Sequence, residues 1–337
     1  MISYRKLAMR VLGNSPVSAV KTARRSTAKR AAALALTAAL VVGMTLPAFA
    51  QDWYIENGDI SISAGTNGNN VTQGETTKEN DTDTVIKSSD PSTASSNTVT
   101  IDAGEGKTVN VTLDNVTINV DEGYKYGYDS NAYKTAVSVT GSGNTNIELN
   151  GNNTLTSGYG HAGLEHNKTD DSGTLTIQDE KNDDGSAKGS ASDTTGSLTA
   201  TGGYHGAGIG GSNEKDGQVT ITGGEITATG GNGAAGIGGG DGDTDAVGGD
   251  GDVTISGGTI TATGGSLAAG IGGGAYGNGT VTVTDGDITA KATGRYGAGI
   301  GGGYGAIPED TLIGGNGTVT ISGGTITEAS GGYMAAG

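Results

Sequence analysis

Residues 253–274 read VTISGGTITATGGSLAAGIGGG, and this stretch decides the fold. Close copies of it begin at Val219, Val281 and Val319, so successive copies start 34, 28 and 38 residues apart. The length differences fall mainly in the linker after each Gly-Gly-Gly, whereas the copy itself keeps a near-constant length. A period of this size is typical of stacked repeats, each of which buries its apolar face only against its neighbours.

Each copy holds three short segments. In the first two, Val-Thr-Ile-Ser and Thr-Ile-Thr-Ala-Thr, a hydroxyl residue alternates with an aliphatic one, which is typical of strands buried on one side. The third segment, Ala-Gly-Ile-Gly, places one aliphatic residue among glycines. Glycine pairs between the segments permit the positive φ angles of tight corners. Because like strands recur only after roughly 28 residues, they are too far apart for hairpins, and we expect parallel stacking about 4.8 Å apart.

The sequence therefore predicts an all-β fold, a right-handed parallel β-helix with three faces and about seven coils of roughly 28 residues plus corner loops. We expect a signal peptide at 1–50, an N-terminal cap at 51–98 and the β-helix at 99–337. Trp53 is expected to cover the end of the core. The last copy stops at Gly337 without the Ile-Gly-Gly-Gly of the others, so we expect the β-helix to continue in a longer protein.

The first fifty residues have the order of a secretory signal peptide. They carry eight basic residues and no acidic one, then the apolar run at 31–46 and the sequence Ala-Phe-Ala at 48–50. This order predicts export and cleavage after Ala50. No apolar stretch that could span a membrane follows, so we expect a secreted, extracellular protein. Association with the cell wall stays open, since no Leu-Pro-x-Thr-Gly motif is present.

The chain after Ala50 is strongly acidic. It holds 11 basic and 36 acidic residues, a formal charge of −25. A surface of this charge repels nucleic acids and anionic lipids, whereas neutral glycans and cations remain compatible with it. We therefore expect no nucleic acid as partner. A polysaccharide or cell-wall glycan is the expected partner, and the alternative is that the charge merely keeps the protein soluble.

The runs Thr174–Ile177, Gly196–Tyr204 and Gly206–Gly211, together with the repeated VTISGGTIT, resemble a known family. The family consists of bacterial secreted or surface proteins with carbohydrate-binding, pectin-lyase-like right-handed β-helix repeats. The resemblance covers roughly 99–337. It implies the β-helix fold and a secreted or cell-wall-associated protein that binds carbohydrate. It transfers no defined set of binding residues.

Tyrosines recur at the corners beside the third segment. Sugars present apolar faces that stack on aromatic rings, so repeated corner tyrosines favour a glycan groove. The candidate carbohydrate-binding residues are Tyr204, Tyr296, Tyr333, Tyr276 and Tyr304. The alternative is that they are ordinary corner residues.

An acidic loop at 241–252 is a candidate calcium site. Its carboxylates are Asp241, Asp243, Asp245, Asp250 and Asp252. Oxygen ligands at every second residue, with an acid at the twelfth position, follow the spacing of loops that bind Ca²⁺. Ala246 stands where glycine is usual, however, and an Asp replaces the usual bidentate Glu. A solvated acidic loop is the alternative.

Two histidines lie at corresponding places in adjacent coils. His161 and His205 precede the aliphatic residue of the third segment by three or four residues, so we expect them to be near neighbours. With Glu165 they form a candidate metal pair. Ordinary corner positions are the alternative.

These observations favour a non-enzymatic extracellular or cell-surface protein that binds polysaccharide or acts as an adhesin or structural stalk. One alternative is a polysaccharide lyase or glycoside hydrolase on the same fold. A lyase would need a basic residue, and Arg295 is the one arginine after Ala50. A hydrolase would need two carboxylates held close together, and the outward acids do not fall in one column. The second alternative is an ice-binding array formed by the Thr-x-Thr columns.

Overall fold

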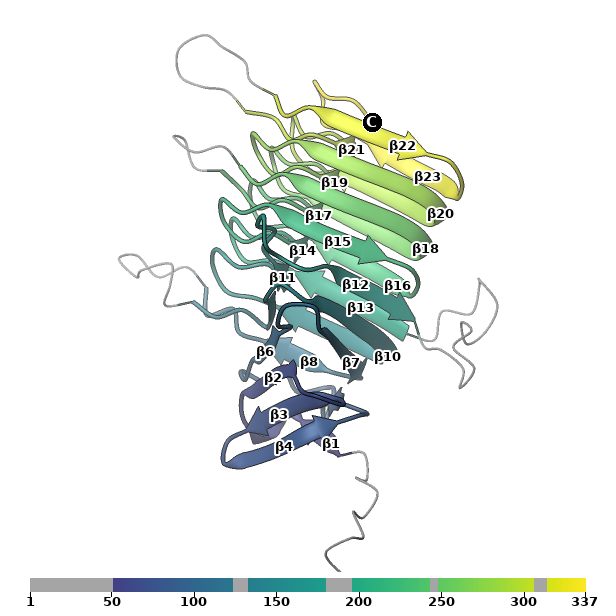
Figure 1. The fold of residues 1–337 in the computed structure, drawn as a ribbon. Coiled ribbons are helices and arrows are strands. Elements are labelled where there is room, and N and C mark those ends of the chain that lie inside the picture. Colours follow the sequence, from purple (N-terminus) through teal and green to yellow (C-terminus); the bar gives the residue numbers. More distant parts are fainter. Residues whose placement is uncertain (1–50, 124–132, 180–195, 243–247, 306–313) are drawn as a thin grey trace, which may run out of the picture. The chain divides into compact units, whose positions relative to one another are not determined.

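The computed structural model describes residues 51–123, 133–179, 196–242, 248–305 and 314–337. The described residues all belong to one compact unit, Ala50–Gly337. They form β-strands and one short 3-10 turn, η1 at Ile55–Asn57 (Figure 1). Within these ranges no helix is long and apolar enough to cross a membrane. The predicted signal peptide and its cleavage site lie outside the described residues.

Strands from the first and second segments of the coils make up a 13-stranded sheet. The first series is β1 (Asp52–Tyr54), β5 (Val85–Lys87), β7 (Thr108–Asp114), β10 (Asn144–Thr156), β12 (Leu175–Asp179), β15 (Gly217–Ile221), β18 (Gly251–Gly264), β20 (Gly279–Ala292) and β22 (Gly317–Ile321). The second series is β8 (Thr117–Asn119), β13 (Gly196–Thr201), β16 (Glu225–Thr229) and β23 (Thr325–Ser330), with the second halves of β10, β18 and β20.

The third segments make up a 10-stranded sheet. Its strands are β4 (Thr76–Asp81), β3 (Asn69–Gln73), β2 (Ile60–Ala64), β6 (Val99–Asp102), β9 (Val137–Thr140), β11 (Leu164–His166), β14 (Ile209–Gly210), β17 (Ile237–Gly238), β19 (Ile271–Gly272) and β21 (Ile300–Gly301). Pairing is antiparallel in the β2–β3–β4 meander and parallel in the other described pairs of this sheet.

Parallel stacking of successive coils is confirmed by the strand register. Val219 of β15 pairs with Val253 of β18, which pairs with Val281 of β20 and then with Val319 of β22. These are the four residues at which the sequence copies begin, so each copy starts in register on the next, and irregularities follow at Ser256 of β18 and after Ile288 of β20. The unequal linkers between the copies do not disturb this register.

The three segments of each coil fall into two sheets in the structure. β10, β18 and β20 each run through both the first and the second segment of their coil, so these two segments share one sheet. The chain bends between the two segments at Gly151, Gly258 and Gly286, which all have positive φ. Glycine makes this bend without a steric penalty. Pairing with the neighbouring coil is interrupted there and resumes in the second segment, at 151–156 of β10 and 259–264 of β18.

The core is a column of aliphatic side chains. Ile209, Ile237 and Ile271 pair in register along β14, β17 and β19, and each is fully buried. The inward residues of the other two series are mainly Val, Ile, Leu and Ala and are also buried. Each coil therefore covers the apolar residues of the next, as in other repeat architectures.

Glycine is required where the third segments stack. Gly238 has φ +133°, and a Cβ placed on it would lie 2.0 Å from the carbonyl oxygen of Gly272 in the next coil. In the same way, a Cβ placed on Gly272 would lie 1.9 Å from the carbonyl oxygen of Gly301. A side chain at either position would push two coils apart, which explains the repeated Ile-Gly-Gly.

The segment 51–98, predicted as a cap, contributes both to the parallel ladders and to a meander. β1 and β2 pair in parallel with β5 and β6, whereas β3 and β4 add antiparallel strands at the end of the 10-stranded sheet. Trp53 is buried in the core, and its indole N–H donates a hydrogen bond to Asp81 Oδ2 at 3.0 Å. Lys78 forms an ion pair with the same carboxylate at 2.8 Å.

A core substitution tests the stacked column. Ile237→Ala removes a fully buried side chain between two coils, so we expect the free energy of unfolding to fall by about 2–5 kcal/mol. Thr261→Ala, an exposed position on β18, should change it by less than about 1 kcal/mol. Urea unfolding followed by circular dichroism measures both. Equal effects of the two substitutions would contradict a continuous core.

Candidate functional site

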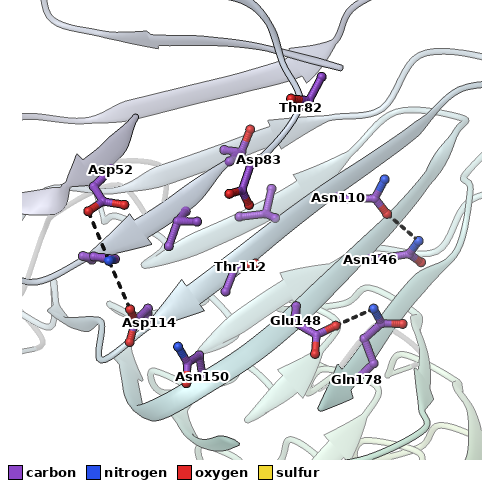
Figure 2. A pocket seen from close by; sticks show the side chains of 14 residues that line it. Asp52, Thr82, Asp83, Asn110, Thr112, Asp114, Asn146, Glu148, Asn150 and Gln178 are labelled. Atoms are coloured by element: carbon purple, nitrogen blue, oxygen red, sulfur yellow. Dashed lines mark hydrogen bonds and ion pairs between the residues drawn. The ribbon is translucent and has the colours of Figure 1, made fainter. Parts of the chain in front are cut away.

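A polar groove crosses the outward face of the first strand series in the N-terminal coils. It has a volume of about 600 Å³ (Figure 2). The residues that line it are Asp52, Thr82, Asp83, Thr84, Val85, Lys87, Asn110, Val111, Thr112, Asp114, Asn146, Glu148, Asn150 and Gln178. They come from β1, β5, β7, β10 and β12, and from the segment just before β5. We refer to this cavity as the polar groove.

Rows of amides and carboxylates form the floor of the polar groove. Side chains on a strand alternate between the core and solvent, so parallel stacking places outward residues of successive coils side by side. Asn110 pairs in register with Asn146, whose Nδ2 donates to Asn110 Oδ1 at 2.8 Å. Glu148 pairs with Gln178, whose Nε2 donates to Glu148 Oε2 at 2.6 Å. Both bonds join neighbouring coils and orient these side chains before any ligand arrives.

The same column changes character in the later coils. Asn146 is in register with Thr176, which is in register with Thr220, and the column continues through Thr254 and Thr282. In this column the amide side chains therefore lie in the N-terminal coils. Amides both donate and accept hydrogen bonds. The groove lies where the repeat departs from its threonine pattern.

Lys87 connects three strands at one end of the groove. Its Nζ lies 3.1 Å from Asp52 Oδ2 on β1 and 3.4 Å from Asp114 Oδ2 on β7. The hydrogen bond that Lys87 donates to Asp52 is the main cause of a raised Lys87 pKa, and the attraction of both carboxylates outweighs the opposing effect of burial. Lys87 is therefore charged and held in place at neutral pH.

The groove carries an excess of negative charge. Four carboxylates line it, from Asp52, Asp83, Asp114 and Glu148, together with the single ammonium of Lys87. Two of these carboxylates bind Lys87, and Asp83 is exposed to solvent. The groove thus offers amide donors and acceptors and a net negative charge among its lining residues, which suits a hydroxylated ligand that is neutral or cationic.

The five candidate tyrosines do not form one row. Tyr204 is 49% exposed and stacks on Tyr159 of the preceding coil, with ring centroids 5.6 Å apart and an interplanar angle of 7°. Tyr296 stacks instead on Tyr304, at 4.4 Å and 19°. Each stacked ring therefore has one face covered by its partner. The covered face is not available to a sugar.

The other two candidate tyrosines lie with the second pair. Tyr333 is 85% exposed and lies 5.6 Å from the guanidinium of Arg295, measured to the ring centroid. The backbone N–H of Tyr276 donates to the carbonyl of Tyr304. Two aromatic groups thus exist, one around Tyr204 and one around Tyr296.

Sequence reasoning missed two members of the first aromatic group. Tyr133 contacts Tyr159 with ring centroids 5.4 Å apart. The signal for Tyr159 is present in the sequence, because Gly158-Tyr159 precedes Ala162-Gly163 much as Gly203-Tyr204 precedes Ala207-Gly208.

The two corner histidines each bind a separate carboxylate. His161 Nδ1 lies 2.8 Å from Glu165 Oε2, and Thr135 Oγ1 lies 2.8 Å from the same nitrogen. His205 Nδ1 bonds Asp241 Oδ2, and His205 also contacts Tyr159 edge-on at 5.3 Å. Among the described residues no group of three or more His, Cys, Asp or Glu side chains could hold a metal ion.

The calcium candidates that the structure describes bind different protein groups. Asp241 bonds His205, Asp250 accepts hydrogen bonds from the backbone and side-chain nitrogens of Asn278, and Asp252 forms an ion pair with Lys168 at 2.7 Å. The remaining two candidates, Asp243 and Asp245, lie outside the described residues. The calcium site therefore stays a prediction.

His166 is the one histidine on a strand of the core. It lies on β11, is 2% exposed, and donates from Nδ1 to the carbonyl of Gln218 at 2.8 Å. Burial disfavours the charged ring and lowers the pKa of His166, and the bond to Gln218 opposes this only in part.

The comparisons with known proteins agree with this architecture. A family model described as a beta helix repeat matches residues 196–213, 219–241, 253–275, 276–304 and 319–337, together roughly a third of the chain. No curated protein and no solved structure matches the chain. The matched segments are the coils from β13 to the end of the chain. The protein therefore carries β-helix repeats.

The pKa of His166 leads to a pH dependence of stability. The unfolded chain, with an ordinary His pKa near 6.5, binds a proton more readily than the folded protein, so stability decreases as the pH falls through about 6.5. We expect a smaller decrease in His166→Asn, whose amide still donates to Gln218 but does not titrate. Urea unfolding between about pH 7.5 and about pH 5.5 compares the two proteins. Parallel stability curves would contradict this role for His166.

Proposed function

We propose that the protein is a secreted, non-enzymatic, right-handed β-helix with three faces that binds polysaccharide through the polar groove. One observation carries the proposal. Asn110, Asn146, Glu148 and Gln178 form hydrogen-bonded rows across the outward face of three successive coils. Sugars are recognised through hydroxyl groups; amide side chains donate to and accept from hydroxyls, and carboxylates accept from them.

Exposure and location support this proposal. The groove is open along the strand face, so a chain could lie in it without threading through the protein. Its polar side chains are held by bonds to neighbouring coils, which lowers the entropy lost on binding. The signal-like order of residues 1–50 supports an extracellular location. A cell-surface adhesin or stalk would use the same groove to attach to a glycan.

Binding to a panel of plant, host and bacterial polysaccharides tests the proposed function. Affinity electrophoresis with the purified protein should identify at least one soluble polysaccharide that retards it. The double variant Asn146→Ala, Gln178→Ala should bind about 5- to 150-fold more weakly, since it loses two groups worth about 0.5–1.5 kcal/mol each. Thr254→Ala with Thr282→Ala is the matched control, because these residues continue the Asn146 column outside the groove.

Three other outcomes of this experiment are informative. No binding to any member of the panel, or equal binding by the groove variant and its control, would overturn the proposal. Loss of binding in Tyr204→Ala alone would move the site to the corner tyrosines. Release of reducing ends from a bound polysaccharide would assign the protein to the alternative class, a polysaccharide lyase or glycoside hydrolase.

Ice binding is a second candidate function, and a regular threonine array favours it. Four successive coils present Thr-x-Thr rows in register on the second strand series: Thr154/Thr156, Thr199/Thr201, Thr227/Thr229 and Thr261/Thr263. These hydroxyls form no hydrogen bonds with other described protein groups. They repeat about every 4.8 Å between coils, so they offer ordered water a regular lattice.

Substitution within the array tests this second function. If the array binds ice, the protein inhibits ice recrystallisation, and Thr229→Lys in the middle of the array abolishes the effect. Thr254→Lys, on the other strand series, should leave it intact. Absence of inhibition by the unmodified protein would exclude ice binding, and it would leave the proposed polysaccharide binding untouched.

A further inference from the structure

The long dimension of the polar groove crosses the strands. Its lining residues come from β1, β5, β7, β10 and β12, which pair as direct neighbours in this order. Four steps of about 4.8 Å between these strands give the groove a length of roughly 19 Å. Along the strands its widest lining segments, 110–114 and 146–150, span only about 13 Å. The groove therefore follows the axis along which the coils stack.

One register column forms the midline of the groove. Each of the five strands contributes one residue to this column, and every one of these residues lines the groove. The column consists of Asp52, Val85, Thr112, Glu148 and Gln178. Figure 2 shows Asp52, Thr112, Glu148 and Gln178 in one line across the strands. Each coil thus adds one position to the midline.

Two further columns border the midline, one on each side. On one side Asn146 lies in register with Asn110 and donates a hydrogen bond to it at 2.8 Å. On the other side Lys87, Asp114 and Asn150 lie in register, and Lys87 forms an ion pair with Asp114. Side chains that form hydrogen bonds therefore line both edges of the groove in successive coils (Figure 2).

The spacing of these columns indicates the shape of the ligand. Positions in each column recur once per coil, at the distance between paired strands, about 4.8 Å. An extended β-1,4-linked chain of pyranoses advances by nearly this distance with each sugar, so successive sugars meet equivalent positions in successive coils. An α-1,4-linked chain of glucose curves into a helix instead, and it leaves a straight groove after a few sugars.

The two polar edges match a second property of β-1,4-linked chains. Neighbouring sugars in such a chain are turned over relative to each other, so the same hydroxyl group points alternately to one edge of the chain and to the other. A groove with hydrogen-bonding groups on only one side would contact every second sugar. The columns on both sides of this midline offer partners to each sugar.

We propose that the polar groove binds a β-1,4-linked polysaccharide whose chain runs along the stacking axis, with one sugar against each coil. The inference rests on the proposed function and specifies the linkage and the direction of its ligand. The five strands from β1 to β12 supply five consecutive sugar positions.

Oligosaccharides of defined linkage and length test this inference. By isothermal titration, at least one β-1,4-linked hexamer of glucose, mannose, xylose or N-acetylglucosamine should bind. The α-1,4-linked glucose hexamer should bind at least about tenfold more weakly than the best of these. Within the β-linked series that binds, affinity should rise from dimer to pentamer and then level off, because a sixth sugar extends beyond the groove.

Substitutions along the midline test the direction of the chain. Thr112→Trp places a large ring on the central strand, so it should lower the affinity of the pentamer to that of the dimer, which still binds beside the ring. Gln178→Ala, at one end of the midline, should weaken the pentamer and leave the dimer nearly unchanged. Thr254→Trp, on the same strand series outside the groove, is the control. Circular dichroism confirms that each variant is folded.

The outcomes distinguish this inference from the proposed function. An α-1,4-linked glucose hexamer that bound as tightly as the best β-1,4-linked hexamer would overturn the assigned linkage. If Thr112→Trp and Gln178→Ala each changed the affinities of dimer and pentamer by the same factor, the axial direction would be wrong. In both cases polysaccharide binding by the polar groove would stand. If no oligosaccharide or polysaccharide bound at all, the proposed function would fail as well.

Discussion

Hydrogen bonding between successive parallel coils is the constraint on which the rest of this structure depends. Every coil must present its backbone to the next at the spacing of paired strands, about 4.8 Å. Only a constant coil path allows this, so Val219 lies on Val253 and Val253 lies on Val281. Close contact between backbones also excludes side chains at positions such as Gly238. The glycine-rich composition follows from this requirement.

Because of the same constraint, inward residues determine the stability of the protein and outward residues are available for a binding site. Inward residues form the continuous core and must remain aliphatic, and corner glycines must allow close stacking. Outward residues contribute little to the core, so they are free to change from coil to coil. The column that begins with Asn110 and Asn146 and ends with threonines shows this freedom directly. A site can therefore appear on part of an otherwise regular face.

The sequence predicted the inward isoleucines from the alternation within one coil, and it predicted the parallel stacking from the recurrence of like segments roughly 28 residues apart. It could not predict the polar groove, since Glu148 and Gln178 are 30 residues apart and meet only through the register of β10 and β12. The corner tyrosines show the same limit. Tyr204 and Tyr296 look equivalent in the sequence, but each stacks on a different partner, Tyr159 and Tyr304. Which rings meet depends on backbone paths at the corners that residue spacing does not specify.

Register also determines how the polar groove can recognise a ligand. A polar side chain without a partner samples several rotamers, and fixing one rotamer against a ligand costs side-chain entropy. Here the bonds from Asn146 to Asn110 and from Gln178 to Glu148 already hold these side chains, and Lys87 is held between two aspartates. Part of this side-chain entropy is thus lost during folding and not on binding. The smaller cost matters most for the affinity of a weakly interacting ligand such as a sugar chain. Stacking of coils therefore supplies both the stability of the protein and the order of its candidate binding surface.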